Sequence, residues 1–167
     1  MSVVPALRAL RINAVELLRQ PGAVKPVSVV LGAEARQALD LDDPRLAGDV
    51  GFDGEAVASI DGVAVRGEVT VPWQGSCRRC LTDVAGVAVA EFDEVFQPAG
   101  RATGDAIEFA GDQIDLAPVV REYVLLELPD APLCRPDCPG VYPEYAGDSD
   151  GRDPRWAALG DLRLDDE

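Results

Sequence analysis

The clearest hydrophobic pattern in the chain is an alternation of apolar and polar residues after Asp61 and Gly62. The valines at positions 63, 65, 69 and 71 share one parity, and Arg66, Glu68 and Thr70 share the other. Alternation with a period of two predicts a strand with one buried face. Residues 55–60 form a second β-rich segment, and Asp-Gly between two such segments favours a type I′ turn because glycine accepts a positive φ. Residues 55–71 are therefore predicted to form a β-hairpin.

Three further segments have the composition of strands, namely residues 27–31, 84–96 and 106–110. Residues 32–54 mix alanine, aspartate and glycine without a clear period. We therefore expect them to form a long connection that includes a single turn of helix.

Two segments are predicted to be helical. Residues 13–19 begin with Asn13, a favoured N-cap residue, and Pro21 and Gly22 end the segment. A longer helix is predicted near residues 116–128, beginning at Asp115 and ending before Pro129. Its apolar residues recur at helical spacing, which indicates one face packed on a core.

These elements together predict a single α+β domain over residues 1–167. Its sheet is expected to be mainly antiparallel, and both an open sheet and a barrel-like one fit the sequence. A short N-terminal helix and the helix near 116–128 complete it. The apolar residues of segment 147–167 do not recur at a regular spacing, and we expect a loosely ordered C-terminal tail there.

Composition narrows the classes of function. The chain has 167 residues, 15 basic and 30 acidic, with a formal net charge of −15. This negative net charge excludes a basic protein that binds nucleic-acid phosphates through its overall electrostatic field. Residues 1–40 carry five basic and three acidic side chains, so the acidic excess lies in residues 41–167. The excess acidic side chains either form a well-hydrated surface or attract a basic partner, such as a ribosomal protein.

Other absences in the sequence exclude further classes. The chain contains no histidine, so it cannot use an imidazole base, a Ser-His-Asp triad or a histidine metal ligand of its own. No apolar run approaches about 18 residues, and the N-terminal residues lack the pattern of a signal peptide. We therefore expect no membrane span, no small-molecule substrate and no catalytic residue.

Four cysteines form the one chemical motif of the sequence. Cys77 and Cys80 have C-x2-C spacing, Cys134 and Cys138 have C-x3-C spacing, and 53 residues separate the two pairs. Two short-spaced pairs can supply the four thiolates of a structural zinc site, although the gap is longer than in a zinc ribbon. The alternatives are reduced metal-free thiols, disulfides, an iron site or a C-x-x-C redox centre.

Three arginines lie beside these cysteines, at positions 78, 79 and 135. Four thiolates around a divalent ion carry a net charge of about −2, which Arg78, Arg79 and Arg135 would offset. The same arginines are candidates for contact with RNA or with a protein partner.

The order of these segments resembles the YceD family of bacterial proteins. The matching residues are 15–22, 60–67, 77–81, 92–96, 114–122, 128–134, 137–140 and 153–159. Many relatives continue after the second cysteine pair with another C-x-x-C, where this chain has Tyr142 and Tyr145. We therefore favour Cys77, Cys80, Cys134 and Cys138 as a self-contained set of zinc ligands.

The resemblance implies a role in accumulation or processing of large-subunit (23S) ribosomal RNA, and hence in ribosome assembly. We expect a cytoplasmic, non-enzymatic factor that contacts a ribosomal protein or another assembly component, and that affects rRNA indirectly or weakly. Two alternatives stay open. One is direct RNA binding through the arginines beside the cysteines, together with Arg8, Arg11 and Arg19, and the other is a thiol redox protein.

Overall fold

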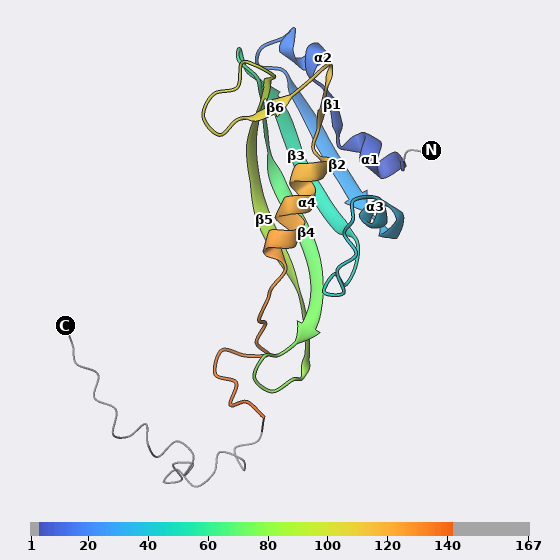
Figure 1. The fold of residues 1–167 in the computed structure, drawn as a ribbon, viewed down its shortest axis with the longest axis vertical. Coiled ribbons are helices and arrows are strands. Elements are labelled where there is room, and N and C mark those ends of the chain that lie inside the picture. Colours follow the sequence, from blue (N-terminus) through green and yellow to red (C-terminus); the bar gives the residue numbers. More distant parts are fainter. Residues whose placement is uncertain (1–3, 142–167) are drawn as a thin grey trace, which may run out of the picture.

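A computed structural model describes residues 4–141 of the chain (Figure 1). Tyr142, Tyr145 and the predicted tail at 147–167 lie outside the described residues. In chain order the elements are α1 (Pro5–Ala9), β1 (Arg11–Asn13), α2 (Ala14–Leu18), β2 (Val24–Leu31), α3 (Ala33–Ala38), β3 (Val50–Ala58), β4 (Val63–Ser76), β5 (Asp83–Pro98), β6 (Ile107–Phe109), β7 (Gln113–Asp115) and α4 (Ala117–Glu127).

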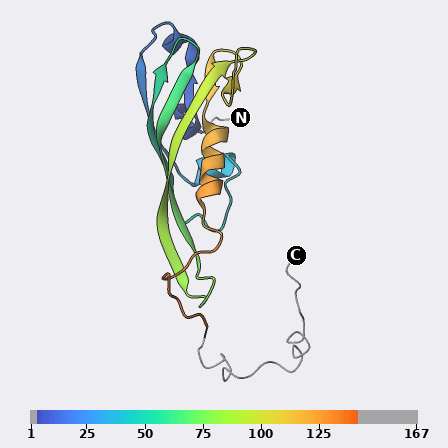
Figure 2. The same ribbon diagram turned by 90° about the vertical axis from the view of Figure 1, so that its left-hand side faces the viewer.

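The architecture is α+β, as predicted, and the main sheet is mostly antiparallel. Its five strands follow the order β2-β3-β4-β5-β6, and only the short β5–β6 pairing is parallel. A separate two-stranded sheet joins β1 to β7. The five-stranded sheet has β2 and β6 at its edges. It therefore does not close into the barrel that the sequence also allowed. Instead, α4 lies along one side of the sheet and covers its apolar face (Figure 2).

The core lies between this covered face and α4. The four valines of β4 that share one parity are all fully buried, so the alternation predicted from the sequence is confirmed. The rings of Phe52 on β3 and Phe92 on β5 meet edge to face with centroids 5.2 Å apart. Phe92 also packs against Tyr123 of α4, at 4.8 Å between ring centroids. One aromatic group thus links two strands to the helix.

The predicted hairpin is present as β3 and β4, but its turn is not of type I′. Gly62 does not have a positive φ, and the turn spans residues 59–62, closed by the Ser59 N–H donating to the Gly62 carbonyl at 2.8 Å. A Cβ at Gly62 would lie 2.3 Å from the carbonyl oxygen of Phe96 on β5. Glycine is therefore needed at position 62 because a neighbouring strand passes close to it. The backbone there does not adopt the left-handed conformation that glycine favours.

The helices begin largely where the sequence predicts. Asn13 caps α2 by accepting the Glu16 N–H at 3.1 Å. The first N–H of α4, that of Ala117, donates to the Asp115 carboxylate at 3.0 Å. The connection predicted at 32–54 contains its single short helix, α3, but its last residues belong to β3, which begins at Val50.

A glycine substitution on β3 tests how closely β3 and β4 approach. A Cβ at Gly54 would lie 2.3 Å from the carbonyl oxygen of Arg66, whereas one at Gly51 would meet the Thr70 Cβ at an ordinary 3.6 Å. We expect Gly54→Ala to lower the free energy of unfolding by about 1–3 kcal/mol, as other overpacked sites do. Gly51→Ala on the same strand is the control and should leave stability unchanged or slightly raised. Denaturant unfolding of both variants measures the difference, and equal stabilities would contradict it.

Candidate metal centre

The two cysteine pairs meet at the far end of the β4–β5 hairpin. Both strands continue past the start of β3, where Gly51 pairs with Thr70 of β4. Figure 1 shows the hairpin extending beyond α4 and the chain after α4 running to its tip. The first pair lies in the hairpin loop and the second in the segment that follows α4, so the sheet and the helix each deliver two thiols to one place.

The four sulfur atoms form one compact group, which we call the cysteine cluster. All lie within 4.8 Å of one another. The Sγ atoms of Cys77 and Cys138 are 3.8 Å apart, and those of Cys80 and Cys134 are 3.6 Å apart. A disulfide requires about 2.05 Å between sulfurs, and all four cysteines are free thiols.

These distances fit a tetrahedral metal site. With metal–sulfur bonds of about 2.3 Å, tetrahedral geometry separates neighbouring sulfurs by about 3.8 Å. Four protein thiolates would fill the coordination sphere, so such a site has no open position for a substrate. The structure therefore brings together all four predicted ligands in an arrangement compatible with a structural metal ion.

The backbone at the first pair folds into a tight loop. The Cys77 N–H donates to the Thr82 carbonyl at 2.8 Å, and the Leu81 N–H donates to the Cys77 carbonyl at 2.9 Å. Leu81 has a φ of 61°, a left-handed conformation that is uncommon for a residue other than glycine. At this left-handed residue the chain turns back toward β5, and both sulfurs of the loop lie within 4.8 Å of those of the second pair.

Hydrogen bonds at the cysteine cluster shift the pKa values of three of its thiols. Backbone N–H groups, first that of Cys80 and then that of Cys134, lower the pKa of Cys77 to about 6 because they stabilise its thiolate. The Thr82 hydroxyl, 3.0 Å from the Cys80 sulfur, contributes most to lowering the pKa of Cys80. By contrast, the neighbouring Cys138 thiol and burial raise the pKa of Cys134 to about 12.

The three predicted contact arginines have different surroundings. Arg79 donates to the carbonyls of Pro136 at 3.4 Å and Cys138 at 3.0 Å, and so fastens one cysteine pair to the other. Arg135 forms an exposed ion pair with Asp137 at 3.5 Å. Arg78 is exposed, and its backbone N–H donates to the Pro132 carbonyl at 2.9 Å. Of these three arginine side chains, that of Arg79 is the one that joins the two pairs.

Arg45 directs the second pair toward the hairpin tip, a role that no sequence motif signals. Its guanidinium contacts Asp43 at 2.9 Å and Asp130 at 2.7 Å, just beyond the end of α4. Its hydrogen bonds hold the pKa of Asp43 below the usual value. This clamp ties the loop before β3 to the start of the segment that carries Cys134 and Cys138.

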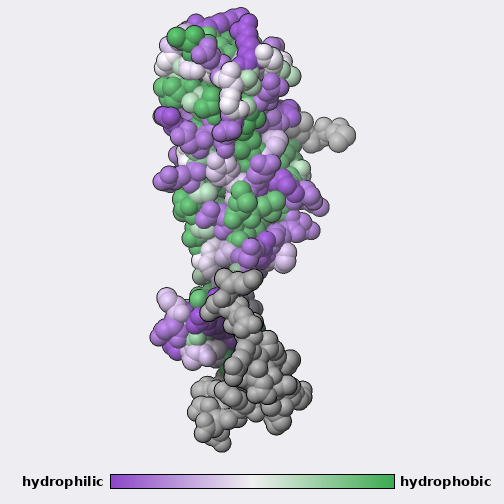
Figure 3. Space-filling view, turned by 60° about the vertical axis from the view of Figure 1, so that its left-hand side comes forward, coloured by the Kyte–Doolittle hydropathy of each residue, from purple (hydrophilic) through white to green (hydrophobic). Residues whose placement is uncertain are grey.

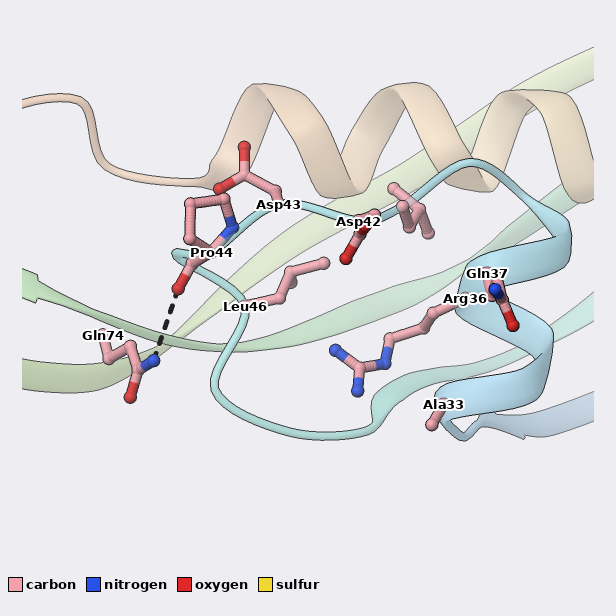
Figure 4. A pocket seen from close by; sticks show the side chains of 9 residues that line it. Ala33, Arg36, Gln37, Asp42, Asp43, Pro44, Leu46 and Gln74 are labelled. Carbon is pink, nitrogen blue, oxygen red and sulfur yellow. Dashed lines mark hydrogen bonds between the residues drawn. The ribbon is translucent and has the colours of Figure 1, made fainter.

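A hollow of about 550 Å³ lies apart from the cysteine cluster, beside α3. Figure 4 shows Arg36 extending from α3 among its lining residues, and Gln74 bonded to the Pro44 carbonyl at 3.3 Å. The Arg36 Nε has no hydrogen-bond partner among the described residues. The lining also carries Asp42 and Asp43, so it presents charges of both signs.

Neighbouring arginines give a matched test of the cysteine cluster. Zinc serves as the probe metal, and replacing Arg79 by Gln should remove its two hydrogen bonds to the second pair and weaken the binding of added zinc about tenfold, the scale of outer contacts around a metal. Arg78→Gln, which removes the same charge one residue earlier, should change zinc affinity little. Competition with a chromophoric chelator measures both. Equal losses in the two variants would show that charge alone, and not the bonds of Arg79, supports the cluster.

No helix among residues 4–141 combines the length and apolar character needed to cross a bilayer.

Residues 65–163 match the family described as Large ribosomal RNA subunit accumulation protein YceD. The chain is 32% identical over 164 residues to an uncharacterized protein of Mycobacterium tuberculosis, an alignment that covers 90% of this chain and 79% of the relative. An uncharacterized protein of Mycobacterium leprae is 33% identical over 163 residues, covering 89% of this chain and 75% of the relative. No solved structure matches the chain. The predicted resemblance is thereby confirmed, and the chain belongs to the YceD family.

Proposed function

We propose that this protein is a cytoplasmic, non-enzymatic ribosome-biogenesis factor. It supports accumulation or processing of large-subunit 23S rRNA through contacts with a basic ribosomal protein or another assembly component. The observation that carries this proposal is membership of a family described by large ribosomal RNA subunit accumulation.

Charge favours a protein partner over direct contact with RNA. The formal net charge of −15 repels a phosphate backbone and attracts the basic proteins that bind rRNA. In this proposal, the level of 23S rRNA changes as a consequence of holding or delivering such a protein.

The cysteine cluster has a structural role in this proposal, with a zinc ion held by its four thiols. The ion fixes the hairpin tip to the segment after α4, and four thiolates leave no coordination position for a reaction. The absence of histidine from the chain also supports a non-enzymatic role.

Two alternative functions make different demands on the same residues. Direct RNA binding would use Arg78, Arg79 and Arg135, but Arg79 and Arg135 already contact protein groups. A thiol redox protein needs a reactive cysteine with a lowered pKa. The pKa values of Cys77 and Cys80 are both lowered. The Cys77 side chain is fully buried, which denies it access to a redox partner, so this alternative would have to use the half-buried Cys80.

Metal content and thiol reactivity test the zinc site together. Protein purified without chelators should contain about one zinc per chain and resist alkylation at all four cysteines, because the thiolates are held by the ion. Cys138→Ser should lose the metal and expose the remaining thiols. Unfolded wild-type protein, in which all four thiols react, is the control. Metal-free protein with four reactive thiols, or with a reversible disulfide, would contradict the proposal.

Cells that lack the protein test its role in rRNA accumulation. We expect the ratio of 23S to 16S rRNA to fall and the wild-type gene to restore it, as measured by quantitative RNA analysis. An unchanged ratio would refute the proposed role.

The same proposal expects purified protein to bind naked 23S rRNA weakly. A tight complex whose affinity falls steeply with salt would instead indicate direct phosphate contacts. If Arg78→Glu combined with Arg135→Glu then abolished that complex, the RNA-binding alternative would replace the protein-contact route.

A further inference from the structure

The main sheet has a second face that no described element covers. Figure 2 shows α4 on one side of the sheet, and the buried side chains of the central strands all point to that side. We call the opposite side the outer face. Along β3, β4 and β5 the residues of this face alternate with the buried ones and are exposed or half-buried. A long stretch of sheet therefore presents its side chains to the surroundings.

Carboxylates cross the middle of the outer face in one row. Asp53, Glu68 and Glu91 are direct partners on three adjacent strands, and all three are exposed. Like charges directly opposite each other destabilise a sheet, and adjacent strands lie only about 4.8 Å apart. We call these three residues the acidic row.

The neighbouring row adds to this charge. It consists of Glu55, Arg66 and Asp93 in register, and Arg66 forms an exposed ion pair with Asp93 at 3.1 Å. The two rows together hold five carboxylates and one guanidinium. Arg66 already pairs with Asp93. Neither of these two rows therefore contains another cation that could balance the acidic row.

Apolar side chains lie on both sides of the acidic row and its neighbouring row. On one side lie Val30 and Val89, which are 64% and 51% exposed, followed by Val87 at 62%. On the other side Val24 and Val95 are 55% and 40% exposed. Figure 3 shows the β5 edge and the α4 side of the molecule, where apolar and hydrophilic residues lie side by side, whereas these valines lie on the opposite side of the sheet. Exposed apolar surface bordered by charge is typical of a protein-binding site.

We infer that the outer face binds a positively charged protein segment whose apolar side chains lie beside its basic ones. Basic side chains would meet the acidic row and relieve its repulsion, and apolar side chains would cover the flanking valines. This inference rests on the proposed function and assigns to it a surface and a class of partner, namely a basic segment of a large-subunit ribosomal protein.

Charge distinguishes this partner from other occupants. A nucleic acid would bring phosphates against the acidic row, which repels them. A second copy of the chain would place one acidic row against another if the two outer faces met. Both occupants are thus opposed by the charges that attract a basic protein segment.

The test uses purified large-subunit ribosomal proteins, each titrated singly against the full chain at physiological salt. Glu68→Gln combined with Glu91→Gln keeps the shape of the face but removes two charges of the acidic row. We expect this variant to bind its ribosomal protein about tenfold more weakly and to be no less stable than wild type. Val87→Ser combined with Val89→Ser should also weaken binding, because it removes apolar contact while leaving the charge unchanged.

Glu34→Gln combined with Glu122→Gln is the matched control, since it removes two exposed charges from α3 and α4. It should bind as wild type does. Equal binding by the control and the Glu68/Glu91 variant, no binding of any ribosomal protein, or self-association through the outer face would each overturn the inference.

The deletion strain separates this inference from the proposed function. Failure of the Glu68/Glu91 variant to restore 23S rRNA supports the outer face as the working surface. Full restoration by that variant, in a strain that requires the wild-type gene, overturns the inference and leaves the proposed function standing. A strain with normal 23S rRNA refutes the proposed function itself.

Discussion

The contact of Phe92 with both Phe52 and Tyr123 holds together the two layers of this protein. Through it β3, β5 and α4 share one apolar group, so the helix can lie on only one side of the sheet. That position determines where α4 ends and where the following chain begins. With α4 on this side, the chain after it runs to the hairpin tip, where the second cysteine pair lies, and no element among residues 4–141 covers the outer face of the sheet.

Local patterns predicted the parts of the fold that depend on local physics. The alternation on β4, the Asn13 cap and the helix near 116–128 can each be inferred from residues close together in sequence. The grouping of the four cysteines was also predictable, because metal-ligand spacing is a short-range signal. These features are therefore visible in the amino-acid sequence alone.

Features that depend on distant residues were not predictable. The strands β1 and β7 have three residues each, too few to show a period, and they exist because they pair with each other. The parallel partner of β6 and the reason for glycine at position 62 both come from β5. At the candidate site, the clamp made by Arg45 and the distinct role of Arg79 arise from contacts across the fold.

The separation of the cysteine pairs has a consequence for the order of folding and metal binding. Bringing together ends that are 53 residues apart carries a loop-closure entropy cost. Here that loop contains β5, β6, β7 and α4, and packing of the core closes it. Core packing would therefore bring the two pairs near each other before an ion binds, and the ion would then fix the hairpin tip to the segment after α4, unlike in a classical zinc finger, which is unfolded without its metal. Metal loading in this protein would then report that folding of the core is complete, and would not be what drives it.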